Sequence, residues 1–379
     1  MRTLISGAGI SGLALANLLQ RQGHSPVVID RRAPDADDGY GLALWPHGTR
    51  VFHALGIHDE FVARSEPMGS YVARSGSGHE LTSSPMPASV HRYGHLGIIA
   101  RADLLAMLRA PLGDTDIRAG VTVERLQQSE DQVDVELDDG TTATFDLVVG
   151  TDGIHSRIRD LLLGRVPDRD TGWGCYVWWA DRRLVAGTET TEHWGAGSFL
   201  GTYPCRDRVC VILGAPVDVL RPDHPHGRTD RLSALLERFR VPVAEYTADL
   251  PSDTEPLFLW PMADVRAPAW VRGRTALVGD AAAAFLPTAG IGASMALESA
   301  AALADELSRT DATYLPNALK LYERRRRSRV EAAQTQSRRL ARVMFVRNRR
   351  LAAVRNRALT HARIEQLVGP LIKELQEPI

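Results

Sequence analysis

The chain has 379 residues, of which 44% are hydrophobic and 24% charged, which is enough apolar material for a large core shared by two domains. Its formal net charge of −1 argues against a nucleic-acid-binding or membrane-surface protein, because such proteins attract their partners with excess positive charge. No stretch reaches the roughly 18 uninterrupted apolar residues of a membrane span, and the three cysteines form no C-x-x-C pair, so we expect a cytoplasmic protein with reduced thiols.

The first 32 residues have the pattern of a nucleotide-binding strand, turn and helix. An apolar strand over Thr3–Ser6 and a helix over Leu13–Arg21 flank a G-x-G-x-x-G turn made by Gly7, Gly9 and Gly12. Gly7 permits the tight turn, Gly9 lets the backbone approach a pyrophosphate, and Gly12 lets the helix pack closely on the strand. The unit predicts a dinucleotide site, and the alternative is a glycine-rich turn in some other α/β protein.

This unit leaves the identity of the dinucleotide open. A second strand over residues 25–29 ends at Asp30, about twenty residues past the turn, where a carboxylate can accept hydrogen bonds from a ribose diol. The N–H groups at the start of the helix face the phosphates. Both features fit FAD and NAD equally well.

The next hundred residues predict two helices, a loop and three strands. We expect helices over 46–55 and 102–109, a loop over 83–94, and strands over 122–127, 132–137 and 142–149. The last strand leads to Asp152-Gly-Ile-His-Ser156, where a helix begins. Asp152 can contact a ligand, because open α/β sheets bind ligands at the carboxyl ends of their strands. It can equally cap the helix together with Ser156.

Residues 171–214 are rich in aromatic and β-branched side chains and predict several antiparallel strands of a second domain. Four of the seven tryptophans lie here. Aromatic side chains on a sheet usually form core, but this concentration beside a nucleotide domain also suits a pocket for a planar apolar substrate. Helices over 229–240 and 243–249 and a strand over 257–260 follow.

A third motif, over residues 274–298, begins with an apolar strand that ends at Gly279-Asp280. A loop containing Pro287 follows, and Gly290-Ile-Gly-Ala-Ser294 then opens a long helix. This arrangement suits a flavin. Asp280 can accept a hydrogen bond from a ribityl hydroxyl, and the helix N-terminus brings N–H groups and positive partial charge to the N1 and O2 edge of a reduced isoalloxazine.

The C-terminal region predicts a long helix over 317–350 and one or two more over 351–375. The long helix carries a run of arginines, Arg324–Arg327. We interpret this run as a solvated helix face laid over the nucleotide domain, rather than as a contact with an acidic partner.

Together the three motifs resemble those of the single-component (group A) FAD-dependent aromatic monooxygenases with the p-hydroxybenzoate hydroxylase fold, in their compact form. The resemblance covers residues 1–345. It implies an α/β fold in which a Rossmann-type FAD-binding domain is interleaved with an antiparallel β-sheet substrate domain and followed by C-terminal helices. It assigns residues 1–70, 97–168 and 268–345 to the FAD-binding domain, 71–96 and 169–267 to the substrate domain, and 346–379 to the helices.

The resemblance also implies which residues bind the cofactor. The first motif holds the FAD pyrophosphate, Asp30 the adenosine ribose with help from Arg31, Arg101 the ribityl-phosphate region, and Asp280 the ribityl chain. The full set of predicted cofactor contacts is Gly7, Gly9, Ile10, Ser11, Gly12, Asp30, Arg31, Arg101, Val123, Asp152, Gly279, Asp280, Pro287, Gly290, Ile291, Gly292, Ala293 and Ser294. The predicted substrate contacts are Trp178, His193, Tyr203 and Trp260.

Two positions depart from the pattern of the family. The family often has His where Ala283 stands and Asn where Ser294 stands. Both differences affect the expected surroundings of the flavin, through its binding or its movement.

The implied reaction is the insertion of one oxygen atom of O2 into an aromatic or polyketide-like small molecule, by hydroxylation, epoxidation or Baeyer–Villiger insertion. A tightly but non-covalently bound FAD is reduced by transient NADPH or NADH and reacts through its C4a-hydroperoxide. Because the flavin carries the chemistry, we predict no catalytic side chain and no metal. His47, His193 and Tyr203 are candidates for deprotonating the substrate. We expect a monomer or homodimer.

Other classes of function are weighed against this interpretation. A flavin halogenase would carry a lysine in the active site, and both lysines, Lys320 and Lys373, lie in the C-terminal helices. An NAD dehydrogenase does not explain Gly279-Asp280. A flavin-fold binding protein that has lost activity stays open because of Ala283 and Ser294, as does another flavin oxidoreductase.

Overall fold

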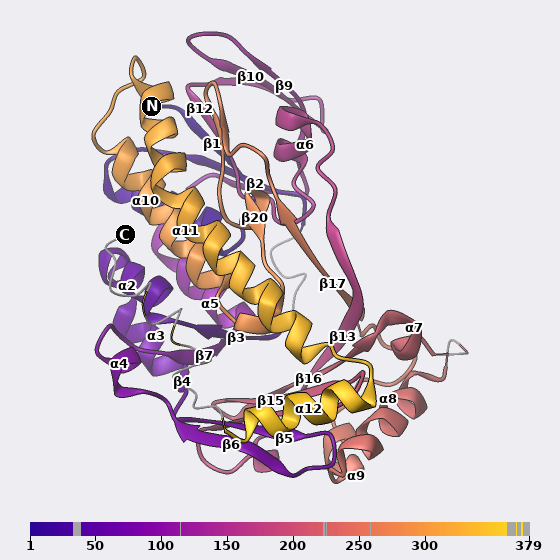
Figure 1. Ribbon diagram of the computed structural model, residues 1–379. Helices are drawn as coiled ribbons and strands as arrows, with labels where there is room; N and C mark the ends of the chain where they lie inside the picture. The colour runs from indigo at the N-terminus through magenta and orange to yellow at the C-terminus, as the bar shows by residue number, and fades with distance from the viewer. Residues whose placement is uncertain are drawn as a thin grey trace.

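The computed structural model describes residues 1–32, 39–113, 115–222, 224, 226–257, 259–361, 369 and 373. The described chain has an α/β layer at one end and a broad antiparallel sheet at the other, joined by two long strands and a long helix (Figure 1). Most of the polar loop after Arg32, and nearly all of the helical region predicted beyond residue 361, lie outside the described residues.

A mainly parallel six-stranded sheet forms the α/β layer. Its order is β18-β19-β12-β1-β2-β8, and every pair from β19 to β8 is parallel. The central strands β1 and β12 are buried along their whole length, as expected where both faces of a sheet are covered. The strands are β1 (Thr3–Ser6), β2 (Val27–Asp30), β8 (Ile117–Ala119), β12 (Leu147–Gly150), β18 (Val271–Arg272) and β19 (Thr275–Leu277).

Helices α1 (Ile10–Arg21) and α10 (Gly292–Leu307) pack on each other and on this layer. Both are rich in small residues, so their axes come close and a single large core includes residues from both. The chain therefore returns to the first layer about 270 residues after leaving it, as the third motif predicted.

A three-stranded meander lies beside the layer, and its strands are β9 (Val123–Gln128), β10 (Val133–Leu137) and β11 (Thr142–Phe145). The single strand predicted over 142–149 is wrong, because it is two strands, β11 and β12. They separate at Asp146, whose N–H donates to the Arg2 carbonyl, and this contact turns the chain out of the meander and into the centre of the parallel sheet.

An eight-stranded sheet forms the second layer, in the order β20-β17-β13-β16-β15-β14-β5-β6. All its pairs are antiparallel except β14 with β5, which comes from a distant part of the chain. Its strands are β5 (Ser70–Ser75), β6 (Glu80–Pro85), β13 (Arg169–Asp181), β14 (Glu189–Trp194), β15 (Phe199–Cys205), β16 (Arg208–Pro216), β17 (Leu259–Arg266) and β20 (Ala283–Ala284).

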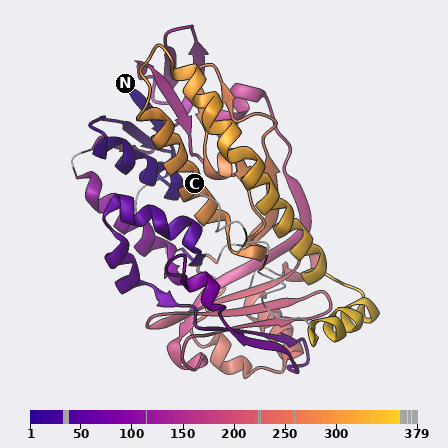
Figure 2. The ribbon, with the colours of Figure 1, turned by 60° about the vertical axis from the view of Figure 1, so that its left-hand side comes forward.

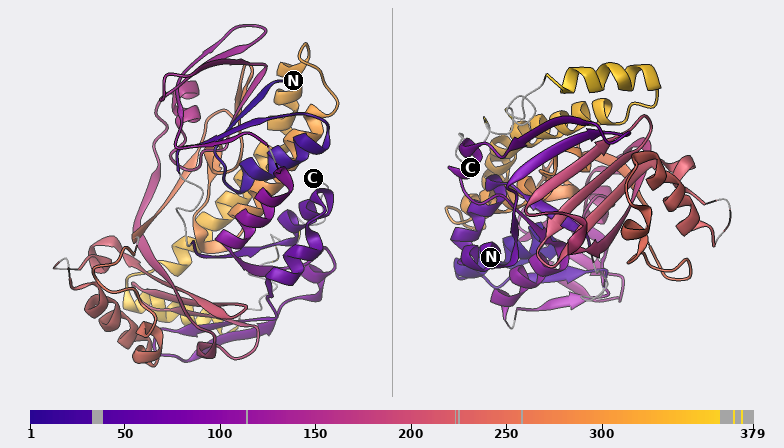
Figure 3. Two further views of the ribbon diagram at one scale, coloured as in Figure 1. Left: turned by 180° about the vertical axis from the view of Figure 1, so that it is seen from behind. Right: turned by 90° about the horizontal axis from the view of Figure 1, so that it is seen from below.

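Strands β13 and β17 run from the α/β layer down into this sheet (Figure 1). The predicted strand over 257–260 is thus too short, since β17 continues to Arg266. The reverse side of the sheet carries α7 (Val217–Leu220), α8 (Arg228–Leu236) and α9 (Val243–Thr247) (Figures 1 and 3).

A small sheet, β3-β7-β4, lies between the two layers with the remaining N-terminal helices. Helix α2 covers the predicted residues, and Gly56 ends it in the left-handed conformation with φ of 68°. The predicted loop over 83–94 is partly wrong, because it contains the end of β6 and a short helix. These elements are β3 (Gly41–Leu44), α2 (Pro46–Leu55), α3 (His58–Arg64), β4 (Glu66–Pro67), α4 (Ala88–His91), β7 (Gly97–Ala100) and α5 (Arg101–Arg109). Helix α6 (Arg157–Leu163) instead lies beside the meander, in contact with β9, β12 and β19.

The 30-residue helix α11 (Leu315–Met344) spans both layers, and α12 (Arg349–Leu359) follows it (Figure 2). The Arg338 guanidinium forms two hydrogen bonds of 2.7 and 2.6 Å with the buried Asp264 carboxylate of β17. The Phe345 ring then stacks on Trp173 of β13, with centroids 4.4 Å apart. Within the described ranges, no helix has the length and apolarity needed to cross a membrane.

Candidate functional site

The glycine-rich turn between β1 and α1 has the geometry that a bound pyrophosphate requires. A Cβ added at Gly7, which has φ of 115°, would lie 2.5 Å from the Thr151 carbonyl oxygen, and one at Gly12 would lie 1.9 Å from the Gly7 carbonyl oxygen. These two glycines are required for packing. A Cβ at Gly9 would meet no atom within 4 Å, so this part of the turn is open to a ligand.

The start of α1 presents backbone N–H groups beside this open space. No side chain caps the helix at Gly9, so its first amides are available to an anion. The Asp30 carboxylate lies close by, where it accepts hydrogen bonds from the Ala8 and Arg32 N–H groups, at 2.7 and 2.8 Å. Asp30 thus orients the turn, and its remaining lone pairs can accept from a ribose.

The third motif meets the first at Gly279. Its φ is 63°, and an added Cβ would lie 2.8 Å from the Ser11 hydroxyl oxygen. The neighbouring Asp280 carboxyl is exposed to solvent although the surrounding chain is dense. The dense surroundings remove water from one side of the Asp280 carboxyl, and this desolvation raises its pKa to about 6. The positive charge of Arg101 acts in the opposite direction. The charge of Arg101 thus acts on Asp280, which places these two side chains near each other beside the turn.

The second motif is occupied by local contacts. The Asp152 carboxylate accepts hydrogen bonds from the Ser156 hydroxyl (2.5 Å) and from the Arg157 and Ile158 N–H groups (2.7 and 3.0 Å). Asp152 and Ser156 therefore cap the helix that follows them, as the alternative to a ligand contact predicts. The adjacent Arg159 is buried and donates to the Ala281 carbonyl at 3.2 Å, so the motif also supports the loop that carries Asp280.

The turn before α10 forms the other end of the site. A short 3-10 turn over Pro287–Ala289 ends at Gly290, which has φ of 58°. The turn is only half-buried, and no side chain caps the N-terminus of α10. Ser294 is fully buried, and its hydroxyl accepts a hydrogen bond from the Trp45 N–H at 3.0 Å. The residue at this position therefore fixes the start of α2 against α10.

Strand β3 connects this turn with the eight-stranded sheet. A Cβ added at Gly290 would lie 3.7 Å from the Ala43 Cβ. At the other end of β3, the Gly41 N–H donates to the Cys210 sulfur at 3.2 Å. We call the face of the sheet that carries Cys210 the near face.

The near face is partly open, whereas the far face is closed. Alternate residues of β13, β15 and β16 point to opposite faces. The far-face residues are buried under α8 and α9 in one apolar cluster. On the near face, Val177, Ile212 and Tyr203 are only half-buried although they lie in the middle of the sheet. An apolar and partly accessible floor of this kind suits a planar substrate.

The four predicted substrate residues separate between the two faces. Trp178 is buried on the far face, where its indole N–H donates to the Tyr246 carbonyl at 2.9 Å. His193 also points to the far face, against the Phe239 ring, and burial and the charge of Arg74 lower its pKa to about 4. This placement argues against a substrate role for both residues, because the sheet separates them from the turn at Gly290.

The other two lie on the near face. Tyr203 packs against the Ile98 and Ala100 cluster beneath β7. Trp260, with 39% of its surface exposed, contacts the Tyr40 ring edge-on at a centroid distance of 4.5 Å.

Three further predicted residues do not line the near face or the glycine turns. Val123 is fully buried in the core, and Arg31 is exposed beside the β2 end. His47 is fully buried at the contact of α2 with α10. Burial lowers the pKa of His47 to about 3, so it is a poor acceptor for a substrate proton.

Sequence reasoning missed two polar residues of the near face, Glu192 and Tyr71. The Glu192 carboxylate accepts hydrogen bonds from the Tyr71 and Tyr203 hydroxyls. The alternation Glu192-His-Trp194 within a strand is a signal of which residues share a face, but the pairing of β14 with the distant β5 is not visible in the sequence.

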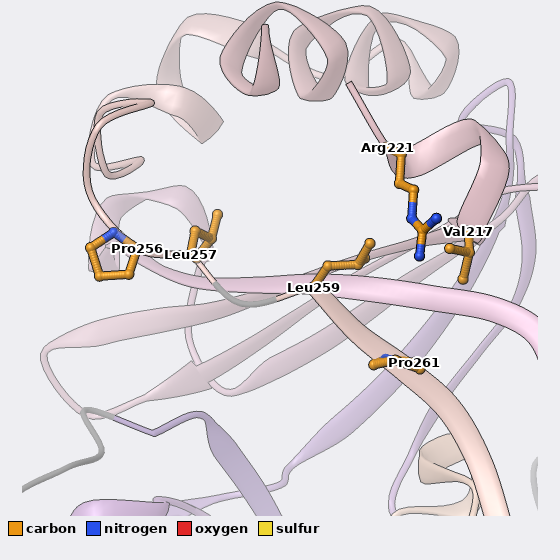
Figure 4. Close-up of a pocket in the computed structure, with 6 residues that line it drawn as sticks. All are labelled: Val217, Arg221, Pro256, Leu257, Leu259 and Pro261. Carbon is orange, nitrogen blue, oxygen red and sulfur yellow. The ribbon is translucent and has the colours of Figure 1, made fainter. Parts of the chain in front are cut away.

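A separate hollow of about 440 Å³ lies at the β17 edge of the sheet. Figure 4 shows the side chains that line it, which come from α7, the residue after it, the segment before β17 and the start of β17. They are Val217, Arg221, Pro256, Leu257, Leu259 and Pro261. None of them belongs to the three motifs, so we do not assign this hollow to the cofactor or substrate.

Comparison with known proteins gives concordant matches. The model of a family described as "FAD binding domain" matches residues 1–337. The chain is 32% identical over 308 residues to 2-heptyl-3-hydroxy-4(1H)-quinolone synthase of Pseudomonas aeruginosa, with 80% of each chain covered. It is 30% identical over 350 residues to 3-amino-4-hydroxybenzoate 2-monooxygenase of Streptomyces cremeus, with 90% of this chain and 87% of the relative covered. The structure of Klebsiella pneumoniae HpxO complexed with FAD and uric acid has the same fold, with a TM-score of 0.90, 24% identity, and coverage of 99% of this chain and 96% of the other.

Proposed function

The chain belongs to the FAD-dependent aromatic monooxygenases of the p-hydroxybenzoate hydroxylase fold. We propose that it binds FAD along the line from Gly9 through Asp280 to Gly290. We further propose that it oxygenates a substrate held on the near face. It is an enzyme that uses FAD and NAD(P)H to insert one oxygen atom of O2 into an aromatic small molecule. The named relatives support oxygenation over halogenation or an inactive binding protein.

The observation that carries the cofactor assignment is the set of three open positions that the fold brings together. Gly9 has empty space where its Cβ would be, Asp280 is an exposed carboxyl in a dense surrounding, and Gly290 ends a half-buried turn. Each lies at a helix N-terminus or a strand end, and the contact of Gly279 with Ser11 joins them. The residues present thus fit an elongated dinucleotide whose ribityl chain connects an anionic pyrophosphate with a flavin ring that becomes negatively charged on reduction.

We assign a role to each part of this line. The first amides of α1 donate to the pyrophosphate, and Asp30 accepts from the adenosine ribose. Asp280 accepts from a ribityl hydroxyl, with Arg101 nearby. The N-terminus of α10 stabilises negative charge at the pyrimidine edge of the flavin. When bound, the flavin supplies the electron transfer and oxygen activation that no side chain of this chain provides.

The protein's own contribution to the reaction is positioning and exclusion of water. Strand β3 holds the turn at Gly290 against the near face, through Ala43 at one end and Gly41 at the other. An aromatic ring lying on Val177 and Ile212 would therefore be close to the flavin edge and shielded by the sheet. One relative named above is a quinolone synthase and the other a monooxygenase of an aminohydroxybenzoate, and we propose an aromatic ring with nitrogen or hydroxyl substituents as the substrate class.

Purified protein tests this assignment directly. It is expected to be yellow, to bleach under argon when NADPH or NADH is added, and to recover its colour in air. With the correct aromatic compound it consumes O2 and releases a product heavier by one oxygen atom, seen by mass spectrometry. A colourless protein that takes up no added FAD would contradict the proposal.

We make three further assignments, of the cellular location, the oligomeric state and the domain bounds. We propose a cytoplasmic location, supported by three buried cysteines that carry no disulfide. We propose a monomer or homodimer, to be measured by light scattering. We also propose the division into a discontinuous FAD-binding domain (1–70, 97–168, 268–345), a substrate domain (71–96, 169–267) and C-terminal helices (346–379).

A further inference from the structure

One polar cluster interrupts the apolar near face. We call it the Glu192 cluster, and it consists of Tyr71, Glu192, Trp194 and Tyr203. One carboxylate oxygen of Glu192 accepts from the Tyr71 hydroxyl (2.6 Å) and the Trp194 indole N–H (2.9 Å), and the other accepts from the Tyr203 hydroxyl (2.7 Å). Three strands, β5, β14 and β15, supply these side chains, so the sheet pairing holds the cluster rigid.

The backbone favours this arrangement of rings. A Cβ added at Gly201 would lie only 2.5 to 2.8 Å from atoms of the Tyr203 ring. Gly201 is the residue paired with Glu192 across β14 and β15. The absent side chain therefore lets the Tyr203 ring lie across the strand toward Glu192, on the floor that carries Ile212.

All the donors of the cluster are directed at one carboxylate. Burial, and then the negative charge of Glu192, raise the pKa of Tyr71 and of Tyr203 well above the ordinary value for tyrosine, so both keep their protons. An indole N–H and a phenol O–H each donate one hydrogen bond. What remains for a ligand is the lone pairs of two phenolic oxygens and of the carboxylate, so the cluster presents acceptors only.

The carboxylate also lacks a cationic partner. In the described part of the chain, its only partners are the two tyrosines and the tryptophan. Two of the arginines on this side of the sheet are engaged elsewhere. Arg355 lies 5.7 Å above the Trp194 ring of the cluster and donates to the Trp194 and Gly195 carbonyls, and Arg208 lies 4.0 Å above the Trp179 ring. The negative charge of Glu192 is therefore not neutralised by an ion pair.

We propose that the Glu192 cluster is the specificity-determining end of the substrate pocket, and that it selects aromatic substrates that bring an N–H or O–H donor and carry no carboxylate. The inference rests on the proposed function, since it takes the near face as the substrate floor. A donor on the ring satisfies the half-buried acceptors, whereas an anionic substituent meets a carboxylate that forms no described ion pair. Of the two compound classes in the relatives' names, this favours quinolones over benzoates.

The test uses the FAD-loaded enzyme and three bicyclic probes. These are 4(1H)-quinolone, its N-methyl analogue and its 2-carboxylate, with binding measured from the change in flavin absorbance. The wild type is expected to bind the N-methyl analogue and the carboxylate at least about tenfold more weakly than the parent, through a lost hydrogen bond and charge repulsion respectively. Equal affinity for the parent and the carboxylate would overturn the proposal.

Variants then separate charge from hydrogen bonding. Glu192→Gln is expected to bring the affinity for the carboxylate to within about threefold of the parent, because the repulsion is removed. Tyr203→Phe keeps the charge, so it weakens the parent about tenfold while the carboxylate stays excluded. Should Glu192→Gln not fold, Tyr203→Phe still decides, because it must weaken the parent and leave the N-methyl analogue unaffected, and equal effects on both would overturn the proposal.

The matched control is Glu189→Gln. This glutamate is on the same strand but points to the far face, where it accepts from the Thr191 hydroxyl, and its substitution is expected to leave the selectivity unchanged. Identical selectivity of the Glu189 and Glu192 variants would refute the inference. Failure of NAD(P)H to bleach the bound flavin would refute the proposed function instead, and it is read independently of these affinities.

Discussion

Glu298 in the second turn of α10 is the point where a single change should cost most stability. Its carboxylate is fully buried and contacts three arginines, Arg50 of α2 and Arg326 and Arg329 of α11, the last two at 2.9 and 3.2 Å. The perturbation is Glu298→Gln, which keeps the shape and removes the charge. Arg326 and Arg329 are themselves buried, so both would lose the charge of this carboxylate.

The magnitude follows from the burial of these charges. Removing one partner of a buried ion pair typically costs about 3 to 5 kcal/mol, because an uncompensated charge stays behind. Burial alone would raise the pKa of Glu298, but the charges of Arg326, Arg329 and Arg50, with His47, outweigh it and hold the pKa below its ordinary value. This carboxylate therefore stabilises the fold above the unfolded pKa, and the contribution is lost as the pH falls through the lower folded pKa.

Urea unfolding followed by tryptophan fluorescence measures this effect. Glu306→Gln is the matched control, since Glu306 is on the same helix but its ion pairs with Arg309 and Arg325 lie near the surface. We expect less than about 1 kcal/mol from the control. We also expect the deficit of Glu298→Gln to shrink at acid pH, where the wild-type carboxylate becomes protonated. If the two variants unfold at the same urea concentration at neutral pH, the reasoning about buried charge is wrong.

Other expected outcomes follow from single positions. Gly9→Val should lower FAD affinity at least about tenfold by filling open space, while the thermal stability of the FAD-free protein stays unchanged. Gly12→Ala, by contrast, should destabilise the FAD-free protein itself, because its Cβ would overlap the Gly7 carbonyl; equal melting temperatures of the two variants would contradict this. Burial raises the pKa of Asp280 to about 6, so this group favours the folded FAD-free protein below its ordinary pKa, and that contribution is lost as the pH rises through 6. Asp280→Asn should therefore flatten the fall in melting temperature from about pH 4 to 7, as scanning calorimetry would measure. His193→Asn should leave the pH profile of turnover unchanged, since the ring lies on the far face; a displaced pH optimum would place it in the reaction after all.

The local elements of this protein could be predicted from sequence because their signals are local. The strand at Thr3–Ser6, the helix over Pro46–Leu55 and the arrival of α10 after Gly290 depend on apolar runs, proline and glycine within a few residues. The order of the three motifs likewise indicated FAD, because a strand ending in Gly279-Asp280 implies a chain that returns to the first sheet. These inferences need only the spacing of residues along the chain.

The sequence alone thus determined the cofactor class, the fold class and the elements that carry the glycines. The tertiary structure decided which side chains share a space. Aromatic composition suggests Trp178 and His193 as substrate contacts, but strand alternation places them on the far face. Tyr71 and Glu192 meet only because β5 pairs in parallel with β14, more than a hundred residues later. Asp152 caps its own helix, and Ser294 holds α2. A side chain's partners depend on register and packing between distant segments, and no local pattern encodes them.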